Sequence, residues 1–226
     1  MLHPALRHVL LNKRAPVVLL LHFDGADATT VFTDSSESSF AVTANGNAQI
    51  DTAQSVFGGA SGLFDGTGDY LSINGGEAFA FGMRDFTIDY RFRTTSVASA
   101  RGHFDNRPAG GSGPYVTLYQ NTDDLRFHTG GADRITSAAA ALAINTQYHV
   151  ALTRCDFTTR LFLNGALVGS YIDFTNYLNP SDRPIIGGLS TTPGNNTAIG
   201  HLDELRVIKG AAAWVSPFVP PLSAYA

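Results

Sequence analysis

Short segments in which apolar and polar residues alternate recur along the chain. In FTIDYRFR, residues 86–93, every second residue is large and apolar. This period of two is that of a strand with one buried face. The run VVLLLHF, residues 17–23, is almost continuously apolar, which is typical of a strand buried on both faces. Outside the first 16 residues, no segment longer than about ten residues keeps the 3.6-residue period of a helix, so the pattern predicts an all-β protein.

Further strands are predicted where β-branched and aromatic residues lie between turns rich in Gly, Asn and Asp. They cover residues 70–73, 115–119, 125–128, 148–153 and 200–208. Asn164-Gly165 lies between the apolar segments RLFL and ALVG and favours the paired positive φ values of a type I′ turn, which predicts a hairpin. The alanine-rich residues 137–144 are compatible with either one helical turn or a bridging loop.

The composition indicates one large domain that can bury a core. The 226 residues are 44% apolar and 15% charged, with 23 glycines and 10 prolines. All-β sandwiches of roughly 200–250 residues often form a single domain. We therefore expect residues 17–226 to form one antiparallel β-sandwich, preceded by an N-terminal arm of residues 1–16.

The arm and the net charge bear on the partners of the protein. A net charge of −4 without a Lys/Arg block disfavours nucleic-acid binding. The arm, MLHPALRHVLLNKRAP, mixes leucines with basic residues, which suits attachment to a partner protein; terminal disorder is the alternative. Its basic residues interrupt any signal-peptide core, and residues 17–23 are too few to span a membrane. The sequence predicts neither a signal peptide nor a membrane partner.

Several short motifs follow one another in a set order. They are LLHFDG (20–25), FGGASGLFDGTGDYL (57–71), FTIDYRF (86–92), YHVALT (148–153), LFLNG (161–165) and IGHLDELRVIK (199–209). Together they resemble the laminin-G-like, concanavalin A-like domains of bacterial surface proteins and tailed-phage virion proteins. The ending, with AWVSPF (213–218), two prolines and Tyr225, is similar to the tail of phage-borne members. Tyr148 stands where members often carry Trp, and both are large aromatic residues.

The resemblance implies a jelly-roll sandwich that binds glycans or other proteins, in some members with a calcium ion. Related sandwiches include glucanases, in which two glutamates and an aspartate alternate along one strand. Here Glu37, Glu77 and Glu204 lie in no E-x-D or D-x-E pattern, and a G-x-S-x-G elbow is also missing from the sequence. The histidines have no zinc-type spacing. Cys155 has no second cysteine to pair with, and we expect a buried, inert thiol.

A calcium site is the one metal site that the sequence leaves open. Calcium binds oxygen atoms at loop ends, and Asp24 and Asp203 would approach each other if the first and last long strands pair. Asp65 and Asp69 bracket a Gly-Thr-Gly turn, where they could instead accept hydrogen bonds from the turn backbone. We therefore name Asp24 and Asp203 as candidate calcium ligands.

Glycan binding needs exposed aromatic rings and polar side chains around them. The candidates lie on the central strands and after the predicted hairpin: Tyr115, Tyr119, Asn121, Arg126, Tyr171, Asp173 and Tyr177. The alternative is that these residues belong to the core or to solvated loops, because a sandwich core itself requires about this many aromatic residues. Trp214 is expected to hold the C-terminal segment against the domain.

These observations predict a protein without enzymatic activity. We expect a virion structural protein, a capsid decoration or tail-associated adhesion module that contacts host-surface or environmental glycans, made in the host cytoplasm and attached through residues 1–16 to other virion proteins. A bacterial surface or secreted carbohydrate-binding module is the first alternative, and a glycoside hydrolase the second. A homo-oligomer is expected, since symmetric oligomers are the norm for virion appendages, and a trimer is compatible with the sequence.

Overall fold

The computed structural model describes residues 15–189 and 194–226. Within these residues the chain forms two antiparallel sheets, and its one helical element is a single 3-10 turn, η1 (Gly76–Ala78). The predicted all-β antiparallel sandwich is confirmed. The predicted arm, residues 1–16, lies outside the described residues except for its last two. No helix in the described part of the chain has the length and apolar character needed to cross a membrane.

Sheet 1 contains eight strands in the order β13-β12-β11-β6-β15-β4-β3, with β1 on the same edge of β15 as β4. Its strands are β1 (Val17–Leu21), β3 (Gln49–Asp51), β4 (Ser61–Asp65), β6 (Phe86–Thr94), β11 (Gln147–Cys155), β12 (Thr158–Leu163), β13 (Ala166–Ile172) and β15 (Ile199–Lys209). β1 pairs with the second half of β15, Leu21 opposite Leu205. The first and last long strands are therefore neighbours, as expected.

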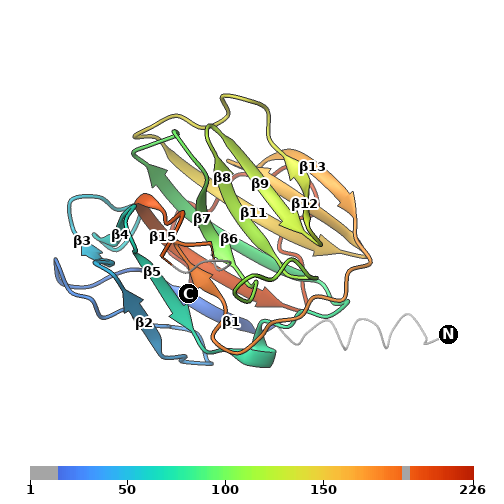
Figure 1. Ribbon diagram of the computed structural model, residues 1–226, viewed down its shortest axis with the longest axis horizontal. Helices are drawn as coiled ribbons and strands as arrows, with labels where there is room; N and C mark the ends of the chain where they lie inside the picture. The colour runs from blue at the N-terminus through green and yellow to red at the C-terminus, as the bar shows by residue number, and fades with distance from the viewer. Residues whose placement is uncertain (1–14, 190–193) are drawn as a thin grey trace.

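Sheet 2 contains seven strands in the order β10-β9-β8-β7-β14-β5-β2. They are β2 (Val42–Asn45), β5 (Tyr70–Ile73), β7 (Arg101–Asp105), β8 (Thr117–Asn121), β9 (Asp124–Thr129), β10 (Ala132–Thr136) and β14 (Ile185–Ile186). Figure 1 looks onto the face of the sandwich, with β7, β8 and β9 in front of β6, β11 and β15.

The alternation along β6 decides which side chains fill the space between the sheets. Phe86, Ile88, Tyr90 and Phe92 are buried in the hydrophobic core, as the sequence pattern predicts. Phe92 stacks on Tyr148 with ring centroids 5.3 Å apart. Both sheets contribute to this core, because the burial of such apolar side chains is the main driving force that holds two sheets together.

The turn of the predicted hairpin has the positive φ values that the sequence predicts. Asn164 and Gly165 have φ values of 50° and 78° and connect β12 to β13. A side chain at Gly165 would also collide with the backbone oxygen of Phe218, so two separate requirements favour glycine there. Residues 137–144 form turns and no helix, which decides between the two alternatives for this segment.

Residues 211–226, the C-terminal tail, lie across the outer face of sheet 1. The main-chain oxygen of Trp214 accepts a hydrogen bond from Thr153 on β11 (2.8 Å), and that of Pro221 accepts one from Arg91 on β6. The Trp214 and Phe218 rings stack with centroids 4.1 Å apart. The predicted role of Trp214 in holding the C-terminal segment against the domain agrees with these contacts.

A buried carboxylate anchors the end of the tail. Asp89 of β6 is fully buried and accepts hydrogen bonds from Arg206 Nε at 3.0 Å and from the Tyr225 hydroxyl. His149 Nε2 lies 3.4 Å from the same carboxylate, and the imidazole meets the Trp214 ring edge to face. Burial lowers the pKa of His149, although Asp89 acts in the opposite direction. His149 is therefore a fully buried, packed residue.

A candidate ligand-binding groove

At one end of the sandwich a fully buried arginine organises two connecting segments. Arg154 of β11 donates from Nε to the oxygen of Arg84 (2.9 Å), from Nη2 to that of Gly82 (2.7 Å) and from Nη1 to that of Thr175 (2.8 Å). Its guanidinium also lies over the rings of Phe86 and Tyr177, 5.2 and 4.8 Å from their centroids. A planar cation with five donors can hold several carbonyl groups in fixed positions.

Asp173 and Tyr177, two predicted glycan ligands, belong to this buried framework. Asp173 Oδ2 accepts hydrogen bonds from Thr159 (2.5 Å) and from the Tyr177 hydroxyl (2.8 Å), and Arg154 Nη1 lies 3.9 Å away. Both side chains are fully buried. Neither side chain is exposed, because their polar atoms are used to fix the segment that follows β13.

Main-chain contacts join this segment to two further loops. Gly82 and Tyr177 form an isolated antiparallel bridge, and the N–H of Leu178 donates to the oxygen of Pro114 at 3.1 Å. The Asn179 amide donates to the oxygens of Gly76 and Arg183, at 2.9 and 3.1 Å. Connections from three parts of the chain are thereby held together on a rigid scaffold, which is a common arrangement for binding sites.

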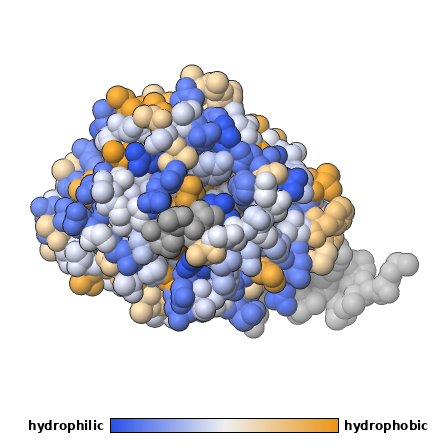
Figure 2. All heavy atoms as spheres, in the orientation of Figure 1, coloured by the Kyte–Doolittle hydropathy of each residue, from blue (hydrophilic) through white to orange (hydrophobic). Residues whose placement is uncertain are grey.

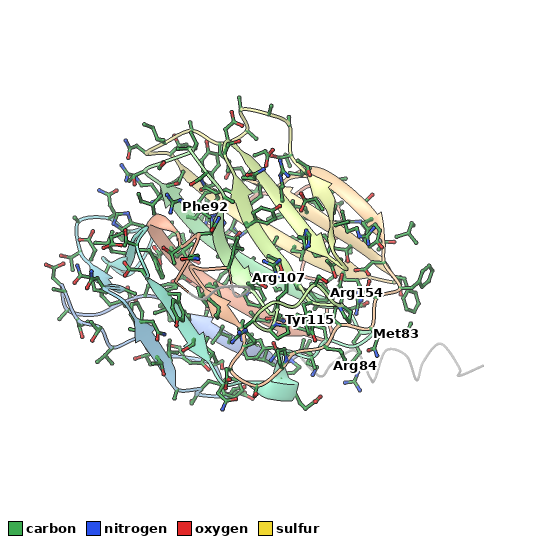
Figure 3. The ribbon with its side chains drawn as sticks, viewed as in Figure 1. Met83, Arg84, Phe92, Arg107, Tyr115 and Arg154 are labelled. Carbon is green, nitrogen blue, oxygen red and sulfur yellow. The ribbon has the colours of Figure 1, made fainter. Side chains whose placement is uncertain are left out.

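These three connections enclose a groove of about 360 Å³, the loop groove. It is lined by Glu77, Ala80, Gly82, Tyr115, Asn176, Tyr177, Leu178, Asn179 and Pro180. Figure 3 shows Arg154 beside Arg84 and Met83 at this end of the molecule, with Tyr115 on a neighbouring loop. A volume within about 300–1,000 Å³, two aromatic rings and two side-chain amides suit a small organic ligand.

A larger hollow of about 650 Å³ lies elsewhere, between the start of β1, the turn at residues 35–37 and Ala226. No aromatic side chain lines it, and it adjoins Ala15, the first described residue. Its size alone does not make it a site, since ligand recognition also needs rings and convergent polar groups. The loop groove has both.

Three other predicted glycan ligands come together on the outer face of sheet 2. Tyr119 and Arg126 both donate to the Asp133 carboxylate at 2.8 Å, and Asn121 accepts from Arg126 once its amide is turned. His128 Nδ1 lies 2.9 Å from Asp133. We call these five residues the sheet-face cluster. Figure 2 shows a mainly hydrophilic surface over β8 and β9, where the cluster lies.

Contacts within the sheet-face cluster shift the pKa values of two of its residues, Asp133 and Tyr119. Burial acts to raise the pKa of Asp133, but hydrogen bonds from His128, Arg126 and Tyr119 outweigh it, so the pKa lies below its usual value. Burial and the Asp133 carboxylate raise the pKa of Tyr119 to about 12. The cluster is therefore a fixed polar network whose donors are largely used internally.

Tyr171 and Tyr115 lie apart from the sheet-face cluster. Tyr171 on β13 is partly buried, with the Arg134 guanidinium 5.3 Å from its ring centroid. Tyr115 lines the loop groove instead. The seven predicted glycan ligands thus divide among the loop groove, its buried framework, the sheet-face cluster and the contact between β13 and β10.

In the described structure, the candidate calcium ligands Asp24 and Asp203 are not joined by a third carboxylate in a group that could hold a metal ion. Asp203 is buried, and its Oδ2 accepts the N–H of Val56 at 2.6 Å. Burial raises the pKa of Asp203 to about 7, so that it carries a partial charge near neutral pH. Asp24 is exposed, and its carboxylate lies against Gly58. Gly58 belongs to the loop that also contacts Asp203. The pairing of β1 with β15 brings the two carboxylates to one loop, as expected. There the Oδ2 atom of Asp203 is occupied by backbone N–H groups, whereas its buried Oδ1 atom has no hydrogen-bond partner among the described residues.

Two other acidic residues cap a turn. Asp65 Oδ1 accepts the N–H of Thr67 at 2.7 Å, and Asp69 Oδ2 accepts that of Asp65 at 2.7 Å. This is the turn-capping alternative for the Gly-Thr-Gly turn.

Cys155 differs from its expected place. The thiol is half-buried at the end of β11 rather than in the core. Among the described residues, Asp85, Cys155 and Asp156 form the one group of three possible metal ligands. Burial and these two carboxylates raise the pKa of the thiol, which disfavours the thiolate that a metal would need.

Several groove residues were missed in the sequence analysis. Glu77, Asn176 and Leu178 come from connecting segments without a strand pattern, and only the tertiary contacts bring them together. Arg154 could have been noticed, because it is the one Arg, Lys, Asp or Glu in a strand that is otherwise buried almost throughout, QYHVALTRC. A charge in such a place is rarely buried unless it is paired.

Solved structures with similar folds include several binding domains. Domain 4 of AbnA, a GH43 extracellular arabinanase from Geobacillus stearothermophilus, solved in complex with arabinotriose, has a TM-score of 0.66 and 15% identity, over 89% of this chain and 96% of that chain. The botulinum neurotoxin serotype G binding domain gives 0.65 and 13%, over 88% of this chain. The present chain covers 48% of that toxin domain.

A third similar structure is the Ruminococcus gnavus IT-sialidase CBM40 bound to α2,3-sialyllactose, with a TM-score of 0.50 and 16% identity, over 59% of this chain and 80% of that chain. No curated protein sequence matches significantly. A family model described as the concanavalin A-like lectin/glucanases superfamily matches residues 65–214, which is more than half of the chain. The fold and this match lead to one conclusion: the chain belongs to the concanavalin A-like lectin/glucanase superfamily.

Proposed function

We propose that the protein is a non-catalytic glycan-binding module and that the loop groove is its binding site. The observation that carries the proposal is the composition of the groove, in which the partly exposed ring of Tyr115 lies near the amides of Asn176 and Asn179. A sugar offers an apolar C–H face and a rim of hydroxyl groups. An aromatic ring suits the first, and amide donors and acceptors suit the second.

The rigidity of the groove supports the same function. Hydrogen bonds tie two of its walls to Arg154, Asp173 or Asn179, and the wall that carries Tyr115 is tied by the bond from the Leu178 N–H to the oxygen of Pro114. Little ordering is then needed when a ligand binds, and this lowers the entropic cost of binding. Domain 4 of AbnA, which shares the fold, was solved with arabinotriose.

The experiment is a pair of tyrosine variants tested on an oligosaccharide array and then by titration calorimetry with the best oligosaccharide. Tyr115→Ala removes the ring of the loop groove. We expect at least about a tenfold loss of affinity, equivalent to about 1.4 kcal/mol. Asn176→Ala, which removes an exposed amide from the same groove, should also weaken binding.

Tyr119→Ala is the matched control, because it removes a tyrosine from the sheet-face cluster and leaves the loop groove intact. We expect unchanged affinity. Loss of binding in Tyr119→Ala with full binding in Tyr115→Ala would contradict the loop groove as the binding site and would indicate a site on sheet 2. Turnover of any oligosaccharide by the parent protein would contradict the absence of catalysis.

We further propose that the module works in a virion, as a decoration or tail-associated adhesion protein. Support comes from the closing segment, residues 213–225, whose sequence resembles the ends of phage-borne members and whose Trp214, Phe218 and Tyr225 all pack on sheet 1. Mass spectrometry of purified particles should detect the protein at a fixed copy number. Its presence only in culture medium or on a bacterial surface would favour the alternative, a bacterial carbohydrate-binding module.

A further inference from the structure

Strand β13 forms one outer edge of sheet 1. Among the described residues it forms main-chain pairs with β12 alone, so its other edge carries backbone groups without a strand partner. An edge of this kind is a template for pairing with another strand. Natural proteins usually protect such edges with charged residues or proline.

β13 has neither form of protection. Its sequence is ALVGSYI, and the segment from residue 165 to 178 contains one charge, Asp173, which is fully buried. The edge strand of the other sheet, β10, differs, since it carries the exposed charges Asp133 and Arg134. One sheet edge is thus protected from pairing and the other is not. β13 has one irregularity, a register shift near Val168, and its residues 169–172 pair regularly with β12.

Exposed apolar side chains surround the open edge. They are Phe157 (40% exposed), Leu167 (46%), Ile172 (65%) and Phe174 (66%), which we call the β13 edge patch. The rings of Phe157 and Phe174 contact each other with centroids 5.2 Å apart. Figure 2 shows hydrophobic residues at the right-hand edge of the molecule, where β13 lies in Figure 1. Contiguous exposed apolar residues with polar neighbours often mark an interaction site.

The backbone conformation of Phe157 is a second indication that this surface has a function. It occupies the turn between β11 and β12 at a φ of 58°, a conformation that bulky residues rarely adopt. The strained position directs its ring to the patch, next to Phe174. Unfavourable backbone conformations that persist are often associated with function.

We propose that the β13 edge is a homodimer interface, in which β13 pairs antiparallel with β13 of a second copy and the two patches pack together. Under twofold symmetry the same surface meets itself, so a charged residue on β13 would be buried once from each copy and would meet no opposite charge on the paired strand. The uncharged edge avoids that burial of charge, and its unpaired N–H and C=O groups match those of an identical antiparallel strand. Arg160 and Asp156 lie beside the patch and would form a polar rim.

The test is the molecular mass in solution, measured by sedimentation equilibrium over a wide range of protein concentration. We expect a mass of twice the chain for the parent protein. Ile172→Lys places a charge without a partner in the apolar surface that the two copies would bury, and should raise the dimer dissociation constant at least about tenfold. Ser170→Lys, at another exposed position of the same strand, provides a second variant if the first folds poorly.

Val219→Lys is the control, because Val219 is equally accessible (78% exposed) but lies on the C-terminal tail. Its mass should equal that of the parent. Deletion of residues 1–14 should also leave the dimer intact. A monomeric parent protein, or a dimer that persists in both β13 variants and disappears on deletion of residues 1–14, would overturn the proposal. Neither result depends on glycan binding.

Discussion

Arg154 shows how one residue can support a site that it does not touch. Its guanidinium donates to three carbonyl groups, those of Gly82, which lines the loop groove, and of Arg84 and Thr175 in the adjoining segments. We expect Arg154→Met to destabilise the fold by about 3–5 kcal/mol, because the buried Asp173 then loses its neighbouring cation and the carbonyl groups lose their donors. Urea unfolding measures this. Arg154→Lys should rescue only part of the loss, since an ammonium lacks the planar fork; full rescue would show that charge alone matters.

Asp203 should make stability depend on pH. Burial raises its pKa from 3.8 to about 7 in the folded protein. A raised folded pKa stabilises the fold while the group is protonated, so this contribution is complete below about pH 4 and is lost as the pH rises towards 7. Asp203→Asn keeps an acceptor for the Val56 N–H. We expect the variant to gain stability relative to the parent across this range, by at most about 1.4 kcal/mol per pH unit.

Thermal unfolding of both proteins at several pH values measures this difference. Parallel curves would contradict the assignment of the raised pKa to Asp203. The same residue bears on calcium, since a protonated carboxyl group is a poor ligand for a hard cation. We expect EDTA, and calcium added afterwards, to leave Tm unchanged at neutral pH. A reversible fall in Tm on chelation would reinstate Asp24 and Asp203 as calcium ligands.

Among the elements, the C-terminal tail is held by aromatic contacts. Phe218 stacks on Trp214 and meets Phe162 of β12 at 5.3 Å between ring centroids. We expect Phe218→Ala to destabilise the fold by about 3 kcal/mol or more, because it leaves a cavity over a buried strand. Val219→Ala, at an exposed neighbour, should stay within about 0.5 kcal/mol. Equal effects of the two variants in urea unfolding would mean that the tail is not packed as described.

Local patterns predicted the elements that local chemistry decides. The alternation in residues 86–93 and the turn at Asn164-Gly165 were enough to find β6 and the β12–β13 hairpin, because side-chain period and φ preference act within a few residues. The alanine-rich segment 137–144 could not be decided in this way. Its helix propensity is too weak to matter beside tertiary contacts such as the hydrogen bond from the Leu125 N–H to Ser137 Oγ.

At the scale of the whole molecule, the candidate site was only partly predictable. Tyr115 was identified, but Glu77 and Asn176 were not, since the groove combines connections that lie far apart in the sequence. Tyr177 was named for its aromatic ring, whereas its burial follows from Arg154 and Asp173, which no short motif links to it. Sequence can name residue types that suit a ligand, but it does not decide which of them are exposed.

A dimer of glycan-binding modules should discriminate between dense and sparse glycans. Because a dimer carries two loop grooves, the second binding event becomes intramolecular. The gain in avidity is about 10²–10⁴-fold where the geometry lets both grooves bind at once. We expect the parent protein to bind a densely coated surface far more tightly than a free oligosaccharide. In surface plasmon resonance, Ile172→Lys should lose this gain and keep its affinity for the free sugar. Equal binding of the parent protein and Ile172→Lys to the coated surface would contradict the connection between the β13 dimer and avidity.

The C-terminal tail also has a consequence for how the protein is made. The tail covers the central strands of sheet 1, which are synthesised well before it. Until the tail has left the ribosome, Phe162 lacks the ring that covers it, and Asp89 lacks the Tyr225 hydroxyl. Each nascent chain therefore carries an unfinished apolar face during translation, when such faces are most prone to aggregate.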